Sequence, residues 1–344
     1  MSRRILAIDV GGGTQDILIY DESQPVENNY KMILPSQTTV LARKIKKLTK
    51  EKKGLFLAGH LMGGGPCVRA LKLHLSRKLP VYSTPQAAKT IKDSLGKVEK
   101  MGVVLRDEPP EGVVSLFLGD VNLKALQNIM DDFEIEMPDK LAVAVQDHGE
   151  SPDMSNRLFR FKHWENFIKE GGNLKDLAYY QQVPPYLTRM NSVQQLIPGS
   201  LLMDTCAAAV WGALEDGYVA SYRDKGLILV NLGNQHTLAV LLKGSRIYGL
   251  FEHHTGIMAP SELSYFLKKL KEGTLTHEEV FDSGGHGCYI SEDYEGSFDF
   301  TAVTGPQRHL AQELGYYQAA PYGDMMLSGC FGLVAAFIAL EKDN

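Results

Sequence analysis

Short apolar runs alternate with amphipathic stretches along the first 150 residues of the chain. Apolar runs bounded by Gly, Pro or polar clusters predict buried strands, and apolar positions with a helical repeat predict helices. The predicted strands lie near residues 5–10, 16–20, 54–59, 79–82, 113–118 and 140–145. The predicted helices lie near residues 37–52, 66–77, 86–95 and 122–134. This alternation is typical of an α/β domain.

The pattern changes near residue 151 and later resumes. The segment that follows is rich in Asn, Gln, Tyr and Pro, and its prolines at Pro184, Pro185 and Pro198 break helices. After it, a helix from Asp204 to Asp216 precedes predicted strands near 226–230, 237–242 and 246–251. The predicted organisation is a first α/β subdomain, an irregular helical connection and a second α/β subdomain, over residues 1–150, 151–203 and 204–344.

A glycine-rich turn separates the first two predicted strands. It consists of Asp9, Val10, Gly11, Gly12, Gly13, Thr14, Gln15 and Asp16. Glycines let the backbone enter φ > 0 conformations and approach an anion, so that successive N–H groups converge on it. Thr14 adds a hydroxyl, Asp9 can hold a hydrated Mg²⁺, and Asp16 can orient the turn or a water. A plain hairpin is the alternative, but it needs neither the acid before the glycines nor the threonine after them.

A second unit of strand, turn and strand lies in the last part of the chain. Its turn reads Asn231, Leu232, Gly233, Asn234, Gln235 and His236, and a strand follows from Thr237. Two such hairpins in corresponding places of two α/β halves indicate a duplicated fold. A phosphate ligand would then bind in the cleft between the halves, with one hairpin on each side of it.

Composition and charge place the chain among ordinary globular proteins of about two domains. It has 344 residues, of which 44% are hydrophobic and 22% charged, and a net charge of −5. This charge argues against nucleic acid or an anionic membrane as the main partner. The segment closest to a membrane span, Met325 to Leu340, is too short to be one. The four cysteines are scattered without Cys-x-x-Cys spacing, so a reduced, cytoplasmic setting is expected.

Taken in this order, the elements resemble those of the actin-like ATPase superfamily, which includes sugar kinases, heat-shock chaperones and acyl-dehydratase activators. Residues 9–16 and 231–237 resemble its two phosphate loops, and residues 301–306 resemble the turn that contacts adenosine. Residues 204–209 and 321–336 resemble its two interdomain helices, where small residues let the helices approach closely and slide. The resemblance implies an α/β fold of duplicated ribonuclease H-like domains with a nucleotide cleft between them.

The resemblance also implies ATP and Mg²⁺ as ligands. Asp9 would place Mg²⁺ through water, and Asp204 would be the general base for an attacking hydroxyl or water. Asp204 could instead be only a helix N-cap. The implied nucleotide contacts are Asp9, Gly11, Gly12, Gly13, Thr14, Asp16, Asn231, Gly233, Asn234, Gln235, His236, Thr237, Thr304, Gly305, Pro306 and Arg308.

The second loop departs from the pattern of chaperones and actin, because it begins with the neutral Asn231 where they have an acid that helps to hold Mg²⁺. Sugar kinases tolerate this change. The leading interpretation is therefore transfer of the γ-phosphate to a small-molecule hydroxyl or to water as the two domains close. The second interpretation is a nucleotide-gated protein that activates a partner enzyme.

As a whole, the chain also resembles a prokaryotic family that carries the label of a pyruvate formate-lyase activating enzyme. A radical activase would need a three-cysteine cluster motif. The cysteines of this chain, Cys67, Cys206, Cys288 and Cys330, lack that spacing.

Histidines form the last signal. Six of the ten lie where predicted strands end, at His60, His148, His236, His253, His254 and His286. The carboxyl ends of strands border the ligand crevice of open α/β sheets, so several of these rings could share one site. His148, His254 and His286 are the candidate metal ligands, with Asp147 or Glu252. In that case the chain could be a degenerate relative with a metal site; alternatively, these are polar residues in loops.

Overall fold

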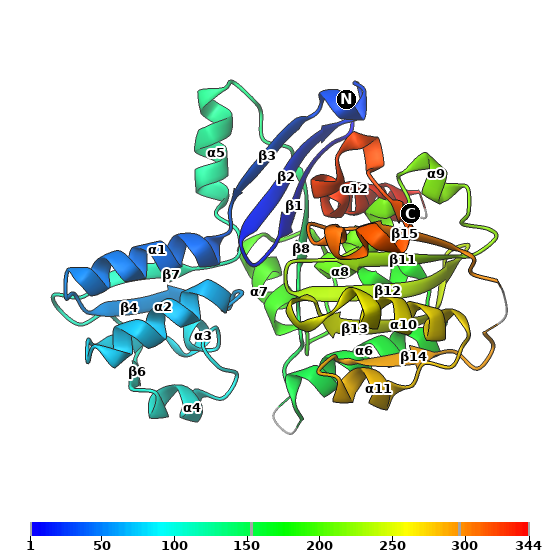
Figure 1. Ribbon diagram of the computed structural model, residues 1–344. Helices are drawn as coiled ribbons and strands as arrows, with labels where there is room; N and C mark the ends of the chain where they lie inside the picture. The colour runs from blue at the N-terminus through cyan, green and yellow to red at the C-terminus, as the bar shows by residue number, and fades with distance from the viewer. Residues whose placement is uncertain (1, 152–153, 295–296, 343–344) are drawn as a thin grey trace.

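The computed structural model describes residues 2–151, 154–294 and 297–342, and these ranges form two six-stranded sheets and a smaller parallel sheet (Figure 1). The first six-stranded sheet has the order β3-β2-β1-β8-β10-β9. Strands β1 to β3 are antiparallel, β8 is parallel to β1, and β10 is parallel to β8. The strands are β1 (Arg4–Val10), β2 (Thr14–Asp21), β3 (Tyr30–Pro35), β8 (Lys140–Val145), β9 (Ala178–Tyr180) and β10 (Leu201–Met203).

The second six-stranded sheet repeats this arrangement. Its order is β14-β13-β12-β11-β15-β16, with β11 to β13 antiparallel and β15 parallel to β11. The strands are β11 (Leu227–Leu232), β12 (His236–Lys243), β13 (Arg246–His254), β14 (Gly287–Ile290), β15 (Phe300–Thr304) and β16 (Tyr317–Gln318). Each sheet thus begins with an antiparallel meander, and two further strands extend it in parallel from the free side of its first strand. The predicted fold class, duplicated ribonuclease H-like α/β domains, is confirmed.

The third sheet is an insertion between β3 and β8, and it lies to one side of the molecule in Figure 1. Its strands are all parallel, in the order β6-β5-β4-β7, and its buried side chains form a separate core. The predicted first subdomain therefore contains two sheets, because the strands near 54–118 pair with one another. The elements of the insertion are α1 (Gln37–Lys50), β4 (Leu55–Gly59), α2 (Gly65–Ser76), β5 (Val81–Ser83), α3 (Pro85–Ala88), α4 (Leu95–Lys100), β6 (Val103–Leu105) and β7 (Val114–Leu118). Helix α5 (Leu123–Asp132) follows β7 and packs on the first six-stranded sheet.

The predicted irregular connection is more regular than expected. It contains α6 (Asn156–Lys169) and α7 (Thr188–Leu196), and its strands β9 and β10 complete the first sheet. Helix α6 begins at Ser155, whose side chain accepts a hydrogen bond from the Leu158 N–H. Its Phe161, Trp164 and Ile168 recur at helical spacing and are buried in the central core. This apolar stripe stabilises a helix despite the polar composition around it.

Two helices join the duplicated domains. Helix α8 (Thr205–Ala213) links β10 of the first sheet to β11 of the second, and α12 (Ser328–Glu341) returns from the second domain to pack on β1 and β8. They cross where a Cβ on Gly212 would lie 1.7 Å from the Ser328 carbonyl oxygen, and one on Gly332 would lie 1.9 Å from that of Ala208. The small residues therefore permit backbone contact, as predicted for the interdomain pair.

The central core spans both domains and includes α6, α8 and α12, while separate clusters fill the other face of each large sheet. No helix among the described residues is both long enough and apolar enough to cross a membrane. The remaining α-helices are α9 (Gly217–Ala220), α10 (Pro260–Lys271) and α11 (His277–Asp282). Short 3₁₀ turns lie at Val26–Asn28, Leu174–Leu177, Thr255–Ile257, Arg308–Leu314, Pro321–Gly323 and Met325–Leu327.

Candidate functional site

A cavity of about 340 Å³ lies where the duplicated domains meet the inserted one. Both glycine turns line it, and they approach each other across it. A Cβ placed on Gly12 of the first turn would lie 2.2 Å from Gln235 Nε2 of the second. The two turns, predicted from separate parts of the sequence, therefore share one site.

The first turn closes the β1–β2 hairpin, in which Asp9 pairs with Asp16. The Gly11 N–H donates to the Thr14 carbonyl at 2.9 Å, and the Gly13 carbonyl accepts from the Ser36 N–H at 3.1 Å. None of the three glycines has a positive φ, so the expected left-handed backbone is wrong. Close approach explains Gly11 and Gly12 better, since a Cβ on Gly11 would lie 3.0 Å from a backbone oxygen, whereas a Cβ on Gly13 would meet no atom within 4 Å.

Two carboxylates flank this turn without enough positive charge to balance them. Oδ1 of Asp9 and Oδ1 of Asp16 are shielded from solvent and have no hydrogen-bond partner. Burial and the nearby Asp16 raise the pKa of Asp9 to about 8, and burial and Asp324 raise the pKa of Asp16 to about 7. From α12, Gly329 packs so closely that a Cβ would lie 2.0 Å from Asp9 Oδ2. A hard divalent cation fits these residues, because it would supply the missing partner for the carboxylate oxygens.

The second turn presents backbone and neutral side chains to the cavity. The Gly233 N–H donates to the His236 carbonyl at 2.9 Å, and Asn234 accepts from the Gln307 amide at 2.9 Å. Every predicted residue of this turn lines the cavity except Thr237. Thr237 is fully buried, and its hydroxyl pairs with that of Thr255 at 3.0 Å. The structure therefore places the predicted phosphate contact Thr237 outside the cavity lining.

The predicted adenosine turn follows β15 and also borders the cavity, through Thr304, Gly305 and Pro306. Gly305 has a φ of +98°, and a Cβ there would lie 2.5 Å from the Leu232 carbonyl oxygen, so only glycine fits. Arg308 does not line the cavity, and its guanidinium donates to the Ala319 carbonyl at 3.1 Å. The guanidinium of Arg308 thus contacts backbone, and Arg308 lies outside the cavity lining.

Asp204 is the N-cap of α8, where its Oδ1 accepts from the Cys206 N–H at 2.9 Å. It is 7% exposed, does not line the cavity, and bridges to Arg160 at 2.8 Å. Burial would raise its pKa, but Arg160 holds the pKa of this carboxyl below its ordinary value. The Asp147 N–H also donates to it, at 3.3 Å. The general-base role predicted for Asp204 does not match these surroundings, because an ion pair and two backbone donors occupy the carboxylate.

Asp147 lies next to Asp204 but does line the cavity. It follows β8, and its two oxygens accept from the N–H groups of Gly149 and Met190, each at 2.9 Å. Burial raises its pKa. The sequence offered Asp147 only as a possible metal ligand, since nothing local places it in the cleft.

The opposite wall was not predicted in full. The turn at residues 63–65, before α2, lines it together with Lys89 and Arg189. Lys89 bridges to Glu150 at 2.8 Å, and Arg189 bridges to Asp120 at 2.7 Å. Both cations come from segments with no motif, so tertiary folding alone brings them to the site.

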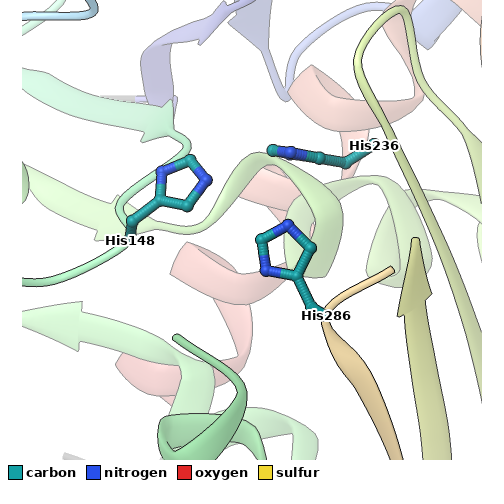
Figure 2. Close-up of side chains that lie close together, drawn as sticks. All are labelled: His148, His236 and His286. Carbon is teal, nitrogen blue, oxygen red and sulfur yellow. The ribbon is translucent and has the colours of Figure 1, made fainter. Parts of the chain in front are cut away.

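Three histidines converge beside the second turn (Figure 2). One nitrogen each from His148, His236 and His286 forms a group whose atoms all lie within 4.8 Å of one another. Burial lowers the pKa of these imidazoles, to about 3 for His148, about 2 for His236 and about 4 for His286. The group confirms that histidines gather, but His236 takes the place predicted for His254. The ring of His254 lies 4.8 Å from those of His236 and His286.

The four cysteines are reduced and buried. Cys206 and Cys330 lie in the central core, Cys67 in the core of the insertion, and Cys288 behind the second sheet. They therefore do not form one cluster, in agreement with their spacing in the sequence.

Comparison with known proteins gives one family and several distant structures. A family model described as "Putative pyruvate format-lyase activating enzyme (DUF1786)" matches residues 62–310. No curated protein matches the sequence.

Similar structures include a Bacteroides thetaiotaomicron protein with actin-like ATPase fold and unknown function, with 8% identity over 98% of this chain and 96% of that one at a TM-score of 0.36. ROK hexokinase from Thermus thermophilus matches with 8% sequence identity and a TM-score of 0.32, and the match covers 98% of this chain and 99% of that one. Ethanolamine utilization protein EutJ from Carboxydothermus hydrogenoformans matches with 10% sequence identity and a TM-score of 0.30, and the match covers 95% of this chain and 88% of that one. At such scores, the fold assignment rests on the strand orders given above.

Proposed function

The chain belongs to the family described as "Putative pyruvate format-lyase activating enzyme (DUF1786)", and we propose that it binds ATP with Mg²⁺ and transfers the γ-phosphate to a small-molecule hydroxyl or to water. The observation that carries this proposal is the meeting of two glycine turns, one from each duplicated domain, at a single cavity. Backbone N–H groups from two sides suit a polyphosphate, whose charge is spread over many oxygens.

In this proposal, Mg²⁺ is held at the first turn by Asp9, directly or through water, with Asp16 beside it. The cation would neutralise charge on the phosphates. The unpartnered oxygens and raised pKa values of both acids support this assignment, because a carboxylate that lacks a cation in a buried site favours its protonated form. Thr14 and the N–H groups of both turns would contact the phosphates, and Gly305 would face the adenosine.

The acceptor would lie on the wall formed by residues 63–65, Lys89 and Arg189. These cations would attract an anionic substrate or orient the transferred phosphoryl group. We assign activation of the attacking hydroxyl to Asp147, because Asp147 lines the cavity, whereas Asp204 does not, and burial raises its pKa in the direction that a general base requires. Asp204 would act as a positioning residue, since it holds Arg160 and the backbone next to Asp147.

The reaction named in the family description finds no support in the cysteines, which occupy three separate cores. Turnover of ATP that requires a partner protein would favour an activator; phosphorylation of a metabolite by the protein alone would favour a kinase.

Calorimetry with Mg²⁺ and ATP tests the proposal. We expect wild type to bind, and Asp9→Ala to lose at least about tenfold in affinity. Asp131→Ala, at an exposed position of α5, is the matched control. Failure of wild type to bind ATP would overturn the proposal. If binding holds, Asp147→Asn should reduce turnover far more than affinity.

A further inference from the structure

Three segments bring imidazole nitrogens to one point at the edge of the cavity (Figure 2). His148 lies in the loop after β8, His236 is the first residue of β12, and His286 directly precedes β14. We propose that these three histidines bind a divalent transition-metal ion, with Zn²⁺ as the best match, in a site whose remaining coordination position opens to the cavity. This inference does not depend on the proposed nucleotide function.

The histidines lack the partners that buried polar groups ordinarily have. His286 is fully buried, and neither of its ring nitrogens makes a hydrogen bond. His236 is 6% exposed, and its Nδ1 has no partner. By contrast, the buried ring of His253 pairs both nitrogens, with the His254 carbonyl and the Ser283 hydroxyl. Buried donors and acceptors are rarely left unpaired, so the free nitrogens indicate a missing ligand.

The spacing suits an ion after small ring movements. A tetrahedral Zn²⁺ with bonds of about 2.0–2.1 Å places its nitrogen ligands about 3.3 Å apart. The three nitrogens lie within 4.8 Å of one another, so the rings would move closer together on metal binding.

A network of buried charged side chains lies beside the rings. Glu252 Oε2 lies 3.9 Å from His286 Nδ1, beyond hydrogen-bond distance, and a carboxylate near a metal-bound histidine is a common outer partner of that ring. Glu252 is fixed by Arg160 and by the Trp164 indole N–H. Arg160 bridges to both Glu252 and Asp204 at 2.8 Å, so the three side chains form one connected network in the protein interior.

His148 and His236 also line the cavity, while His286 closes the site from behind. Three histidines with one open position are characteristic of catalytic rather than structural zinc sites. The open position would hold a water or an anionic oxygen of a ligand in the cavity. The position of His254, beside His236 and His286, provides a further imidazole at the rim.

Metal binding to the full-length protein without a polyhistidine tag tests this proposal. The protein is stripped with a chelator and titrated with Co²⁺, whose visible absorption reports tetrahedral nitrogen coordination, and then with Zn²⁺ by competition. We expect one equivalent of ion. His148→Ala should weaken binding by more than about 100-fold, since loss of an outer-shell partner alone costs 10–100-fold. His148 is the best variant for this test because it is only partly buried, in a loop.

The matched control is His309→Ala, at an exposed position, which should bind like wild type. Circular dichroism and thermal melting verify that each variant folds. Asp9→Ala should keep the Co²⁺ spectrum, so that failure of the nucleotide proposal leaves this one standing. The proposal is overturned if stripped wild type binds no Co²⁺ or Zn²⁺, or if folded His148→Ala binds either ion as tightly as wild type.

Discussion

Replacement of Asp9 by Asn should change how the stability of the protein depends on pH. In the folded protein, burial and Asp16 raise the pKa of Asp9 to about 8 from an ordinary 3.8. Below pH 3.8 the carboxyl is protonated in both states. As the pH rises towards 8, the unfolded chain ionises first, and the stabilisation is lost. Wild type without Mg²⁺ should therefore lose stability over this range through Asp9, whereas Asn, which does not titrate, should not.

The magnitude follows from the same values. Between about pH 5 and pH 8 the carboxyl is ionised only in the unfolded chain, and each pH unit costs about 1.4 kcal/mol, for an upper limit of about 4 kcal/mol. Asp9 is partly exposed to the cavity, and water there screens its charge, so we expect about 2 kcal/mol. Asp16 titrates over a similar range in both proteins and largely cancels in the comparison.

Urea denaturation of wild type and Asp9→Asn across this pH range measures the effect. The free energy of unfolding of the variant should rise relative to wild type as the pH increases, and Mg²⁺ should restore wild type only. Asp131→Asn, at an exposed position, should show neither change. A difference between wild type and Asp9→Asn that is constant with pH would refute the reasoning about the buried acid pair.

Three further predictions concern packing and charge. Gly12→Ala should weaken binding of Mg²⁺ and ATP by about tenfold in calorimetry. The melting temperature should change little, because the new Cβ meets only the flexible side chain of Gln235. Gly256→Ala is the control, since a Cβ there meets no atom within 4 Å. Gly212→Ala should lower the free energy of unfolding by about 3 kcal/mol, because its Cβ would lie 1.7 Å from a backbone oxygen of α12, and wild-type stability would contradict this crossing. Arg160→Met should cost about 3–5 kcal/mol in urea denaturation, since it leaves two buried carboxylates unpaired; a neutral effect would show that they are not ionised together.

Much of the fold could be predicted because its signals are local. The apolar strands around both glycine turns, and the small residues of α8 and α12, mark the duplicated domains and the helices between them. The insertion could not be separated from the first domain, because strand pairing between β4, β5 and β7 is decided by contacts far apart in the sequence. The regularity of helix α6 was not predicted, because the connection has a polar average composition, although the buried stripe of this helix is apolar.

The residues of the candidate site likewise fall into those that a local sequence pattern predicts and those that only tertiary contacts determine. The residues of the two glycine turns that line the cavity could be predicted, because glycines next to an acid or a threonine form a pattern that is local in the sequence. Thr237 and Arg308 were placed at the ligand only through resemblance, and their side chains instead satisfy Thr255 and the Ala319 carbonyl. The surroundings of Asp204 could not be predicted, because they depend on its ion pair with Arg160. Arg160 belongs to α6, in the segment that was predicted only as an irregular helical connection.

The most direct test of the central claim is a crystal structure of the protein with Mg²⁺ and a non-hydrolysable ATP analogue. We predict phosphates between residues 11–14 and 233–236, Mg²⁺ beside Asp9, and the adenosine against Gly305. Binding of the analogue elsewhere, or phosphates that contact only one of the two turns, would contradict the proposal that the duplicated domains share one nucleotide.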